Sequence, residues 1–182
     1  MKRYITYLLN IFVFVGLMSC ASDVDFDQAK NIELNQNFTT SFIYLNVDQN
    51  KFLNSDASAE IPILTDISTI DIFDSKYFED NLVKTTINFQ IENSFDRGFD
   101  IEFSFLNTDD VEMNSFIVSV PNNSNQIHLQ SFEDLDLLSL KFSEKLRITI
   151  NLQPSSDSSM LMQNTEMKLA IKSFANFIFK IN

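Results

Sequence analysis

The feature of this sequence that most restricts its fold is an alternation of apolar and polar residues that recurs along the chain. It is clearest in residues 146–153, where Leu146, Ile148, Ile150 and Leu152 alternate with Arg147, Thr149, Asn151 and Gln153. Because successive side chains of a β-strand point to opposite faces of the sheet, this pattern predicts a strand with one face against a core. The same alternation covers residues 83–92 and 99–105. The sequence therefore predicts a β-rich domain.

A turn is expected between the last two of these runs. Residues 93–98 contain Gly98, the only glycine after residue 16. Glycine adopts a positive φ at little cost, and tight hairpins need such residues. We therefore expect the two runs to pair as a hairpin. A strand at 113–120, ending at the turn-rich residues 121–124, would complete an antiparallel meander.

One segment has the spacing of a short helix. Its apolar residues recur every three or four positions: Phe132, Leu135, Leu138 and Phe142. Ser131 is a suitable N-cap and Asp134 suits the first turn, so the pattern predicts a helix within residues 131–142 that covers the core. A second helical turn is expected at 74–80.

The remaining segments complete the predicted fold. Residues 38–47 and 61–73 are β-rich, 154–165 form a loop, and 167–181 form a long last strand that bends near Ser173. Seven or eight short strands, with turns between them and no βαβ rhythm, predict a mainly β chain. We expect an antiparallel β-sandwich with one or two short helices; the alternative is an open barrel.

The N-terminus carries the pattern of a secretory signal. Lys2 and Arg3 precede an apolar run, residues 4–17, which leads into the tetrapeptide Leu17-Met18-Ser19-Cys20. This segment resembles bacterial lipoprotein signal peptides, and the resemblance implies cleavage before Cys20 and lipid attachment to it. Two alternatives use the same residues. An uncleaved membrane helix would need about 20 apolar residues, more than this run offers, and a secreted protein would keep Cys20 as a free thiol.

Three regions follow from this assignment. Residues 1–19 are the expected signal peptide, 20–36 an acidic tether and 37–182 the β-sandwich domain. The start of the tether, with Asp23, Asp25 and Asp27, resembles acidic export signals of Bacteroidetes lipoproteins; a solvated linker is the alternative. With the lipidation motif and the segment 80–84 before a predicted strand, the whole chain is similar to small lipoproteins of Bacteroidetes-type bacteria. That resemblance implies a secreted β-domain anchored by lipid in the cell envelope. Of the two membranes we expect the outer one, with exposure on the surface if the acidic start of the tether is an export signal; the inner membrane is the alternative.

Charge and cysteine content exclude several classes of function. The net charge is −12, and loss of Lys2 and Arg3 makes it more negative. Nucleic-acid binding needs clustered basic side chains, which this chain lacks. Peripheral binding to anionic lipid membranes is disfavoured for the same reason. Because Cys20 is the only cysteine, the domain has neither a disulfide nor a thiolate metal site.

No residue pattern points to catalysis. His128 is the only histidine, lies in a strand-like stretch and is interpreted as a lone exposed side chain. With one glycine after residue 16, the chain has no glycine-rich phosphate loop. The acidic groups at 109–110, 133–136 and 71–74 lack the spacing of a calcium loop. We expect no catalytic residue, no metal site and no cofactor.

Two classes of function remain. The domain is either a non-catalytic structural or protein-interaction module that docks on an envelope protein through a sheet edge or loop, or it binds a small molecule or polysaccharide. The absence of Trp, with Tyr44 and Tyr77 as the only tyrosines after residue 19, disfavours a sugar platform. We favour the interaction module.

Overall fold

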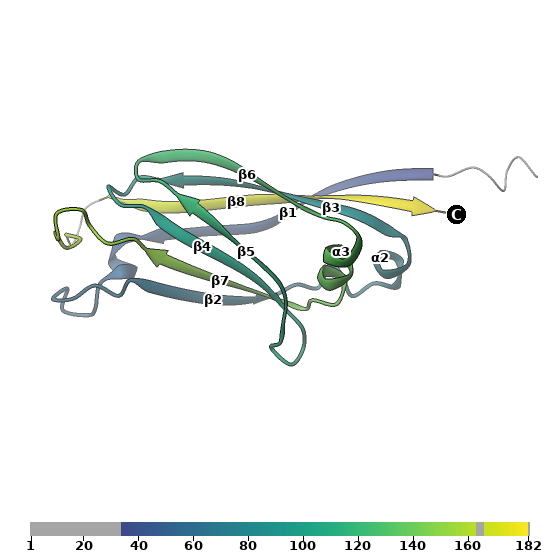
Figure 1. Cartoon of the computed structure of the whole chain (residues 1–182), viewed down its shortest axis with the longest axis horizontal. Helices are drawn as coiled ribbons and strands as arrows, with labels where there is room; N and C mark the ends of the chain where they lie inside the picture. Colours follow the sequence, from purple (N-terminus) through teal and green to yellow (C-terminus); the bar gives the residue numbers. More distant parts are fainter. Residues whose placement is uncertain (1–33, 163–165, 182) are drawn as a thin grey trace, which may run out of the picture. The chain divides into compact units, whose positions relative to one another are not determined.

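Eight strands and three short helical segments make up residues 34–162 and 166–181, which the computed structural model describes (Figure 1). The strands are β1 (Leu34–Asp48), β2 (Ile63–Thr69), β3 (Leu82–Asn93), β4 (Phe99–Leu106), β5 (Glu112–Val120), β6 (Ser124–Phe132), β7 (Lys145–Leu152) and β8 (Lys168–Ile181). The helical segments are the 3-10 turn η2 (Gln49–Phe52) and the α-helices α2 (Lys76–Asn81) and α3 (Asp134–Lys141).

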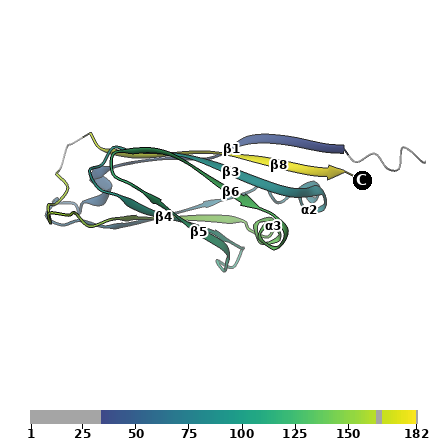
Figure 2. The same cartoon turned by 45° about the horizontal axis from the view of Figure 1, so that its top comes forward.

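The strands form two four-stranded sheets that pack face to face. The order is β1-β8-β3-β6 in the first sheet and β2-β7-β4-β5 in the second, and every pairing is antiparallel. Figure 2 shows the two sheets as separate layers. The predicted antiparallel β-sandwich is therefore confirmed.

A phenylalanine-rich core lies between the layers. Every second residue of β7, from Leu146 to Leu152, is buried, as the alternation predicts. Across the interior, the ring of Phe89 on β3 lies 4.6 Å from that of Phe103 on β4, and both are fully buried. Burial of each such side chain contributes about 1.5–3 kcal/mol, so the core can stabilise the domain without a disulfide.

The predicted hairpin of 83–92 with 99–105 is wrong, whereas the antiparallel pairing of 99–105 with the strand at 113–120 is confirmed. β3 pairs with β6 and β8, whereas β4 pairs with β5 and β7, so residues 93–98 cross from one sheet to the other. Gly98 has no positive φ. A Cβ at this position would lie 2.9 Å from Cδ of Gln153 and 3.0 Å from the carbonyl oxygen of Val120. Glycine is therefore favoured by the close approach of the Val120 carbonyl, while the Gln153 side chain would have to move aside for any larger residue.

The predicted helix exists, but it starts later and exposes the residues expected to face the core. Ser131 belongs to β6, and the helix begins at Asp134. Its buried residues are Leu137 and Leu140, while Leu135 is 78% exposed. Leu138 and Phe142 are exposed as well. Phe132 is buried as expected, but it ends β6 and is not part of the helix.

Other boundaries differ from the expected ones by a few residues. β1 begins at Leu34, so residues 34–36 are part of a strand and not of a tether. β2 is shorter than the β-rich segment 61–73, and the helical turn expected at 74–80 is present as α2. The irregularity expected near Ser173 is a register shift in β1, where Ile43 N–H donates to Ser173 Oγ at 2.9 Å.

Candidate functional site: an open side of the sandwich

One long side of the sandwich is formed by two strand edges that have no neighbouring strand among the described residues. β1 pairs only with β8, and β2 pairs only with β7, so each ends its sheet on the same side. On the opposite side, β5 and β6 follow each other along the chain through the short connection 121–123. β5 and β6 also end their sheets, but the hollows lined by both edge strands lie on the β1–β2 side.

Two adjacent hollows lie between these edges. One, of about 280 Å³, is lined by residues 41–44 of β1 and by residues 68–72. The other, of about 330 Å³, is lined by residues 45–47 of β1 and 64–66 of β2. Both reach Ile148 of β7, so they follow one another along a single groove with an apolar floor. We call this the β1–β2 groove.

The hydrogen bonds that flank β2 show which of its backbone groups face the open edge. Leu152 N–H donates to the carbonyl of Pro62 at 2.8 Å, and Ile70 N–H donates to the carbonyl of Glu144 at 2.7 Å. Even-numbered residues of β2 therefore direct their backbone groups toward β7. Because this direction alternates along an antiparallel strand, the odd-numbered residues, from Ile63 to Thr69, point theirs toward the open edge.

Asp66 partly protects this edge. Its Oδ1 accepts a hydrogen bond from the backbone N–H of Ile67 at 3.1 Å, so one of the free donors already has a partner. Asp66 lies opposite Ile148, which places its side chain on the inner face, where a charge is unusual. Inward charges on edge strands are a known means of opposing uncontrolled strand addition.

The outer face of β2 is apolar in spite of its exposure. Ile63 is 56% exposed and Ile67 is 52% exposed, on a strand of which only Leu64 is partly covered. The charged residues that line the groove are Asp66, Asp71 and Lys51, so its balance is acidic. The geometry can accept an extended segment, with free backbone groups on one side and an apolar floor below.

The residues singled out by sequence occupy other places. Cys20 lies outside the described residues, as do the expected signal peptide and the expected tether up to Glu33. His128 lies on β6, half-buried rather than exposed, with its ring stacked on Phe116 at 5.8 Å. Its Nε2 is enclosed and has no hydrogen-bond partner. It is a packed aromatic ring, far from the arrangement of a catalytic base.

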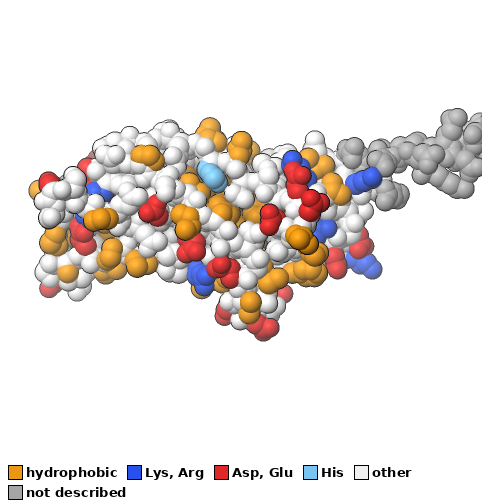
Figure 3. All heavy atoms as spheres, viewed as in Figure 1, with side chains coloured by type: hydrophobic (Ala, Val, Ile, Leu, Met, Phe, Trp, Pro, Cys, Tyr) orange, Lys and Arg blue, Asp and Glu red, His pale blue; other side chains and the backbone are white. Residues whose placement is uncertain are grey.

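The acidic groups are engaged in separate surface contacts. Asp110 pairs with Lys145 at 2.6 Å, and Asp136 accepts a hydrogen bond from Asn114 at 3.1 Å. Within residues 34–162 and 166–181, no three His, Cys, Asp or Glu side chains gather as metal ligands. On the face shown in Figure 3, acidic side chains are spread out and apolar ones gather around α3 and at the end of the domain away from it. No helix in the described part of the chain is long and apolar enough to span a bilayer.

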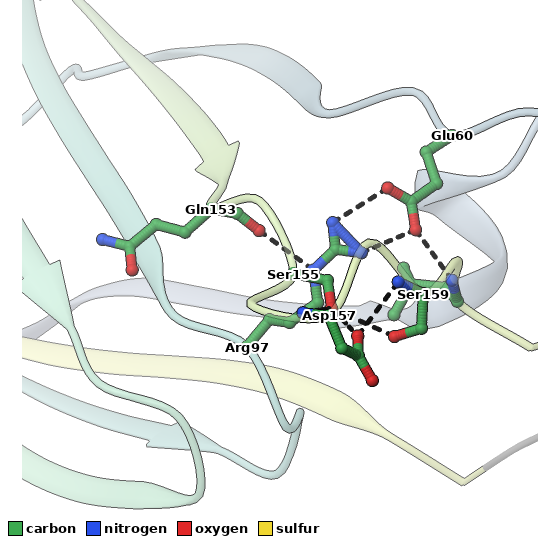
Figure 4. A network of polar contacts seen from close by, with 7 residues as sticks. Glu60, Arg97, Gln153, Ser155, Asp157 and Ser159 are labelled. Atoms are coloured by element: carbon green, nitrogen blue, oxygen red, sulfur yellow. Dashed lines mark hydrogen bonds and ion pairs between the residues drawn. The ribbon is translucent and has the colours of Figure 1, made fainter.

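A polar network ties three loops together at the end of the domain opposite α2 and α3 (Figure 4). The Arg97 guanidinium donates to both carboxylate oxygens of Glu60, at 2.6 and 2.8 Å, and its Nε donates to the carbonyl of Gln153 at 2.9 Å. Arg97 is 8% exposed and Glu60 is 19% exposed. Glu60 Oε1 also accepts the backbone N–H of Leu161 at 2.7 Å. The network therefore fixes the loop 153–162 against the sandwich.

A second carboxylate organises the same loop. The Ser155 hydroxyl donates to Asp157 Oδ1, and the backbone N–H of Ser159 donates to the same oxygen at 3.0 Å. Hydrogen bonds from Ser155, and then from Ser159, hold the pKa of Asp157 well below its usual range, because they favour the ionised carboxylate. The loop is thus a turn built around an ionised side chain.

Comparison with known proteins assigns no family. No family model matches the chain, and no curated protein matches it. Among solved structures, a candidate secreted protein from Parabacteroides distasonis aligns with a TM-score of 0.47 and 14% identity, over 63% of this chain and 38% of that one. The infectious bursal disease virus VP2 subviral particle aligns with a TM-score of 0.42 and 10% identity, over 80% and 33%. PfGH50B aligns with a TM-score of 0.42 and 14% identity, over 80% and 22%.

The chain therefore spans well under half the length of these solved chains. At such identities and TM-scores the likeness assigns neither a family nor a function.

Sequence reasoning did not find the β1–β2 groove. Residues 63–69 do not alternate as the other strands do: Ile63 and Leu64 are adjacent apolar residues, and Asp66 and Ser68 are polar positions on the same face as Leu64. This pattern does not say which of the two faces is buried, so only the register with β7 shows that Asp66 faces inward. The unusual Asp within a β-rich stretch was the available signal.

Proposed function

We propose that the chain is a cell-envelope lipoprotein, anchored through Cys20, whose β-sandwich is a non-catalytic interaction module. Its partner is an envelope protein that adds an extended segment to the open edge of β2. The observation that supports this most directly is the set of outward-facing backbone groups from Ile63 to Thr69, beside a groove with an apolar floor. Strand addition uses backbone hydrogen bonds for affinity and side-chain pockets for specificity.

The groove also indicates the chemistry of the segment. Alternate side chains of an added strand would point into the groove, so apolar residues at every second position suit Ile148 and its neighbours. When the added strand takes the N–H of Ile67, the Asp66 carboxylate loses that hydrogen bond and can pair with a basic residue of the partner. The overall charge of −12 also favours a basic partner. We therefore propose a partner segment that is extended, alternating and basic.

Localisation belongs to the same proposal. The charged start, the apolar run and the Leu17–Cys20 motif support export and lipid attachment, and the acidic residues after Cys20 support the outer membrane and the cell surface. The acidic surface supports a protein partner over nucleic acid. Mass spectrometry of the membrane-purified protein tests the anchor directly. An acylated Cys20 supports it, and an unmodified residue contradicts it.

Site-specific photo-crosslinking tests the docking. A photoreactive residue at Ile63, on the proposed edge, is expected to link to one partner in intact cells. Thr65→Pro removes a backbone N–H on the open edge but none of the bonds to β7, so it should abolish that link. Thr65→Ala keeps the N–H and should leave the link unchanged. A link that survives Thr65→Pro, or no link from Ile63, contradicts the proposal.

A second candidate function rests on a different cavity. A hollow of about 570 Å³ is lined by four aromatic rings, Phe38, Tyr77, Phe78 and Phe179, with Gln36 and Asn37 beside them. Phe38 is 51% exposed and Tyr77 is 44% exposed, so two aromatic rings are accessible to a ligand although the chain has no Trp. Tyr77 OH lies 3.3 Å from Gln36 Oε1, which adds a polar group at the rim. This combination suits a small molecule or a saccharide ring.

Tyrosine emission tests that alternative, since the chain has no Trp. Binding of a saccharide at this cavity should change the emission of Tyr77. Tyr77→Ala should remove both the change and the binding, while Tyr44→Ala, at a tyrosine that is 71% exposed and lines a different hollow, should remove neither. Binding that is indifferent to Tyr77→Ala would place the ligand elsewhere.

A further inference from the structure

Three methionines line one cavity at the end of the domain that carries the Arg97–Glu60 network. Met160, Met162 and Met167 surround a hollow of about 300 Å³, together with Asp96 and Arg97. Met160 is 46% exposed and Met162 is 73% exposed, although methionine is among the residue types most often buried. Met160 and Met162 therefore line this cavity without being buried in the core.

A fully buried side chain holds two of these methionines in place. Gln49, in η2, is 0% exposed. Its Nε2 donates to the carbonyl of Met162 at 2.8 Å, and its Oε1 accepts the backbone N–H of Met167 at 3.3 Å. One amide thus fixes the backbone of both residues.

The third methionine is positioned through its neighbour. Leu161 is buried, and its N–H is bound by Glu60 Oε1 at 2.7 Å, which fixes the backbone between Met160 and Met162. Met167 also packs against the core. Buried polar groups that orient residues from behind are the usual support of a metal site.

The electrostatics of the cavity suit a cation of low charge. Asp96 is an exposed residue of the lining, so it adds a negative charge near the cavity. The charge of Arg97, in the same lining, is matched by the two-point hydrogen bonding to Glu60. Thioether sulfur is a soft ligand that selects Cu(I) over hard cations such as Mg²⁺ and Ca²⁺.

We propose that Met160, Met162 and Met167 form a binding site for a soft monovalent metal ion, Cu(I). The site is independent of the β1–β2 groove, since the two share no lining residue. It needs no cysteine, and the only cysteine of the chain, Cys20, lies far from it in sequence.

Titration with Cu(I) in the presence of a chromogenic chelator, and with Ag(I) as a redox-inert probe, tests the site. The full chain is used in detergent, with Cys20→Ala in every sample so that no thiol competes. The wild-type domain is expected to bind one ion, and the triple variant Met160→Leu/Met162→Leu/Met167→Leu to bind none. Removing a residue that only supports a metal ligand typically lowers the metal affinity by about 10- to 100-fold. Removing a ligand itself, as each single variant does, should therefore lower the Cu(I) affinity by at least about tenfold.

Two controls keep the outcome interpretable. Met113→Leu, at the remaining methionine of the described domain, should leave the affinity unchanged. Leucine is close to methionine in volume, so the variants should fold. Independently of any variant, NMR of methyl-labelled methionine should show Ag(I) shifting the methyl signals of Met160, Met162 and Met167 and leaving that of Met113 in place. Absence of binding, or shifts that spare these three methyl groups, overturns the proposal. The exposed methionines would then be an apolar surface for protein contact.

Discussion

Replacing Arg97 by Met should destabilise the domain far more than any exposed ion pair does. Met keeps much of the apolar volume of the arginine side chain but removes its charge and three hydrogen bonds, two to Glu60 and one to the carbonyl of Gln153. Loss of one partner of a buried ion pair costs about 3–5 kcal/mol, because the other charge stays buried without compensation. Glu60 is 19% exposed and keeps the N–H of Leu161, so we expect the lower end, about 3 kcal/mol.

Urea unfolding followed by circular dichroism measures this loss, which amounts to a large part of the roughly 5–15 kcal/mol that stabilises a typical domain. At about 2–4 °C per kcal/mol for a domain of this size, the midpoint of thermal unfolding should fall by about 6–12 °C. The free energy of unfolding should fall by less in the double variant Glu60→Leu/Arg97→Met than the sum of its losses in the two single variants, because no unpaired charge remains in the double variant.

The control is Lys84→Met, which breaks the pair between Lys84 and Glu133. Their side chains are 39% and 53% exposed, so the cost should stay below about 1 kcal/mol. If Arg97→Met costs no more than Lys84→Met, the network of Figure 4 does not hold the loops, and the reasoning is refuted.

Three further outcomes are expected. Gly98→Ala should cost about 1 kcal/mol in urea unfolding because its Cβ would lie 3.0 Å from the carbonyl oxygen of Val120 and would displace the Gln153 side chain, and truncating Gln153 to Ala should recover only the second part of that loss. Phe103→Ala should cost about 3–5 kcal/mol, since Phe103 is fully buried; a loss below about 1 kcal/mol would contradict its place in the core. The Ser115 hydrogen bond lowers the pKa of Glu112 below its ordinary 4.5, so the ionised carboxylate stabilises the fold above that pH and the benefit disappears as the pH falls through the lowered pKa. Glu112→Gln should therefore flatten the loss of stability on acidification below about pH 4.5, and an unchanged acid profile would contradict this.

Alternation predicted the strands well and their partners poorly. Residues 146–152 and 83–92 lie in β7 and β3 almost as expected, because burial of one face imposes a period of two wherever a strand covers a core. The same period cannot tell whether the next strand lies beside the first or across the core from it. For that reason β3 and β4 were assigned to one hairpin, although they face each other from opposite sheets.

The helix shows a second limit of periodicity. Spacing by three or four is common to the buried and the exposed stripes of α3, and the apolar residues Leu135 and Leu138 belong to the exposed one. The candidate sites could not be predicted from the sequence because they depend on contacts between residues that are far apart in the chain. The spacing of Met160, Met162 and Met167 is visible in the sequence, but their common cavity depends on Gln49, more than a hundred residues earlier.

The position of β8 inside the first sheet sets an order for folding. β8 lies between β1 and β3, and its pairing with β1 joins residues as far apart as Leu34 and Ile181. The second sheet, in contrast, has all four strands once synthesis has passed Leu152. Because contacts between distant residues carry the largest entropic cost of loop closure, the first sheet should assemble late, around β8, which is synthesised after the other described strands. Until β8 is made, β1 lacks the strand with which it pairs, so the first sheet depends for its completion on this fourteen-residue strand.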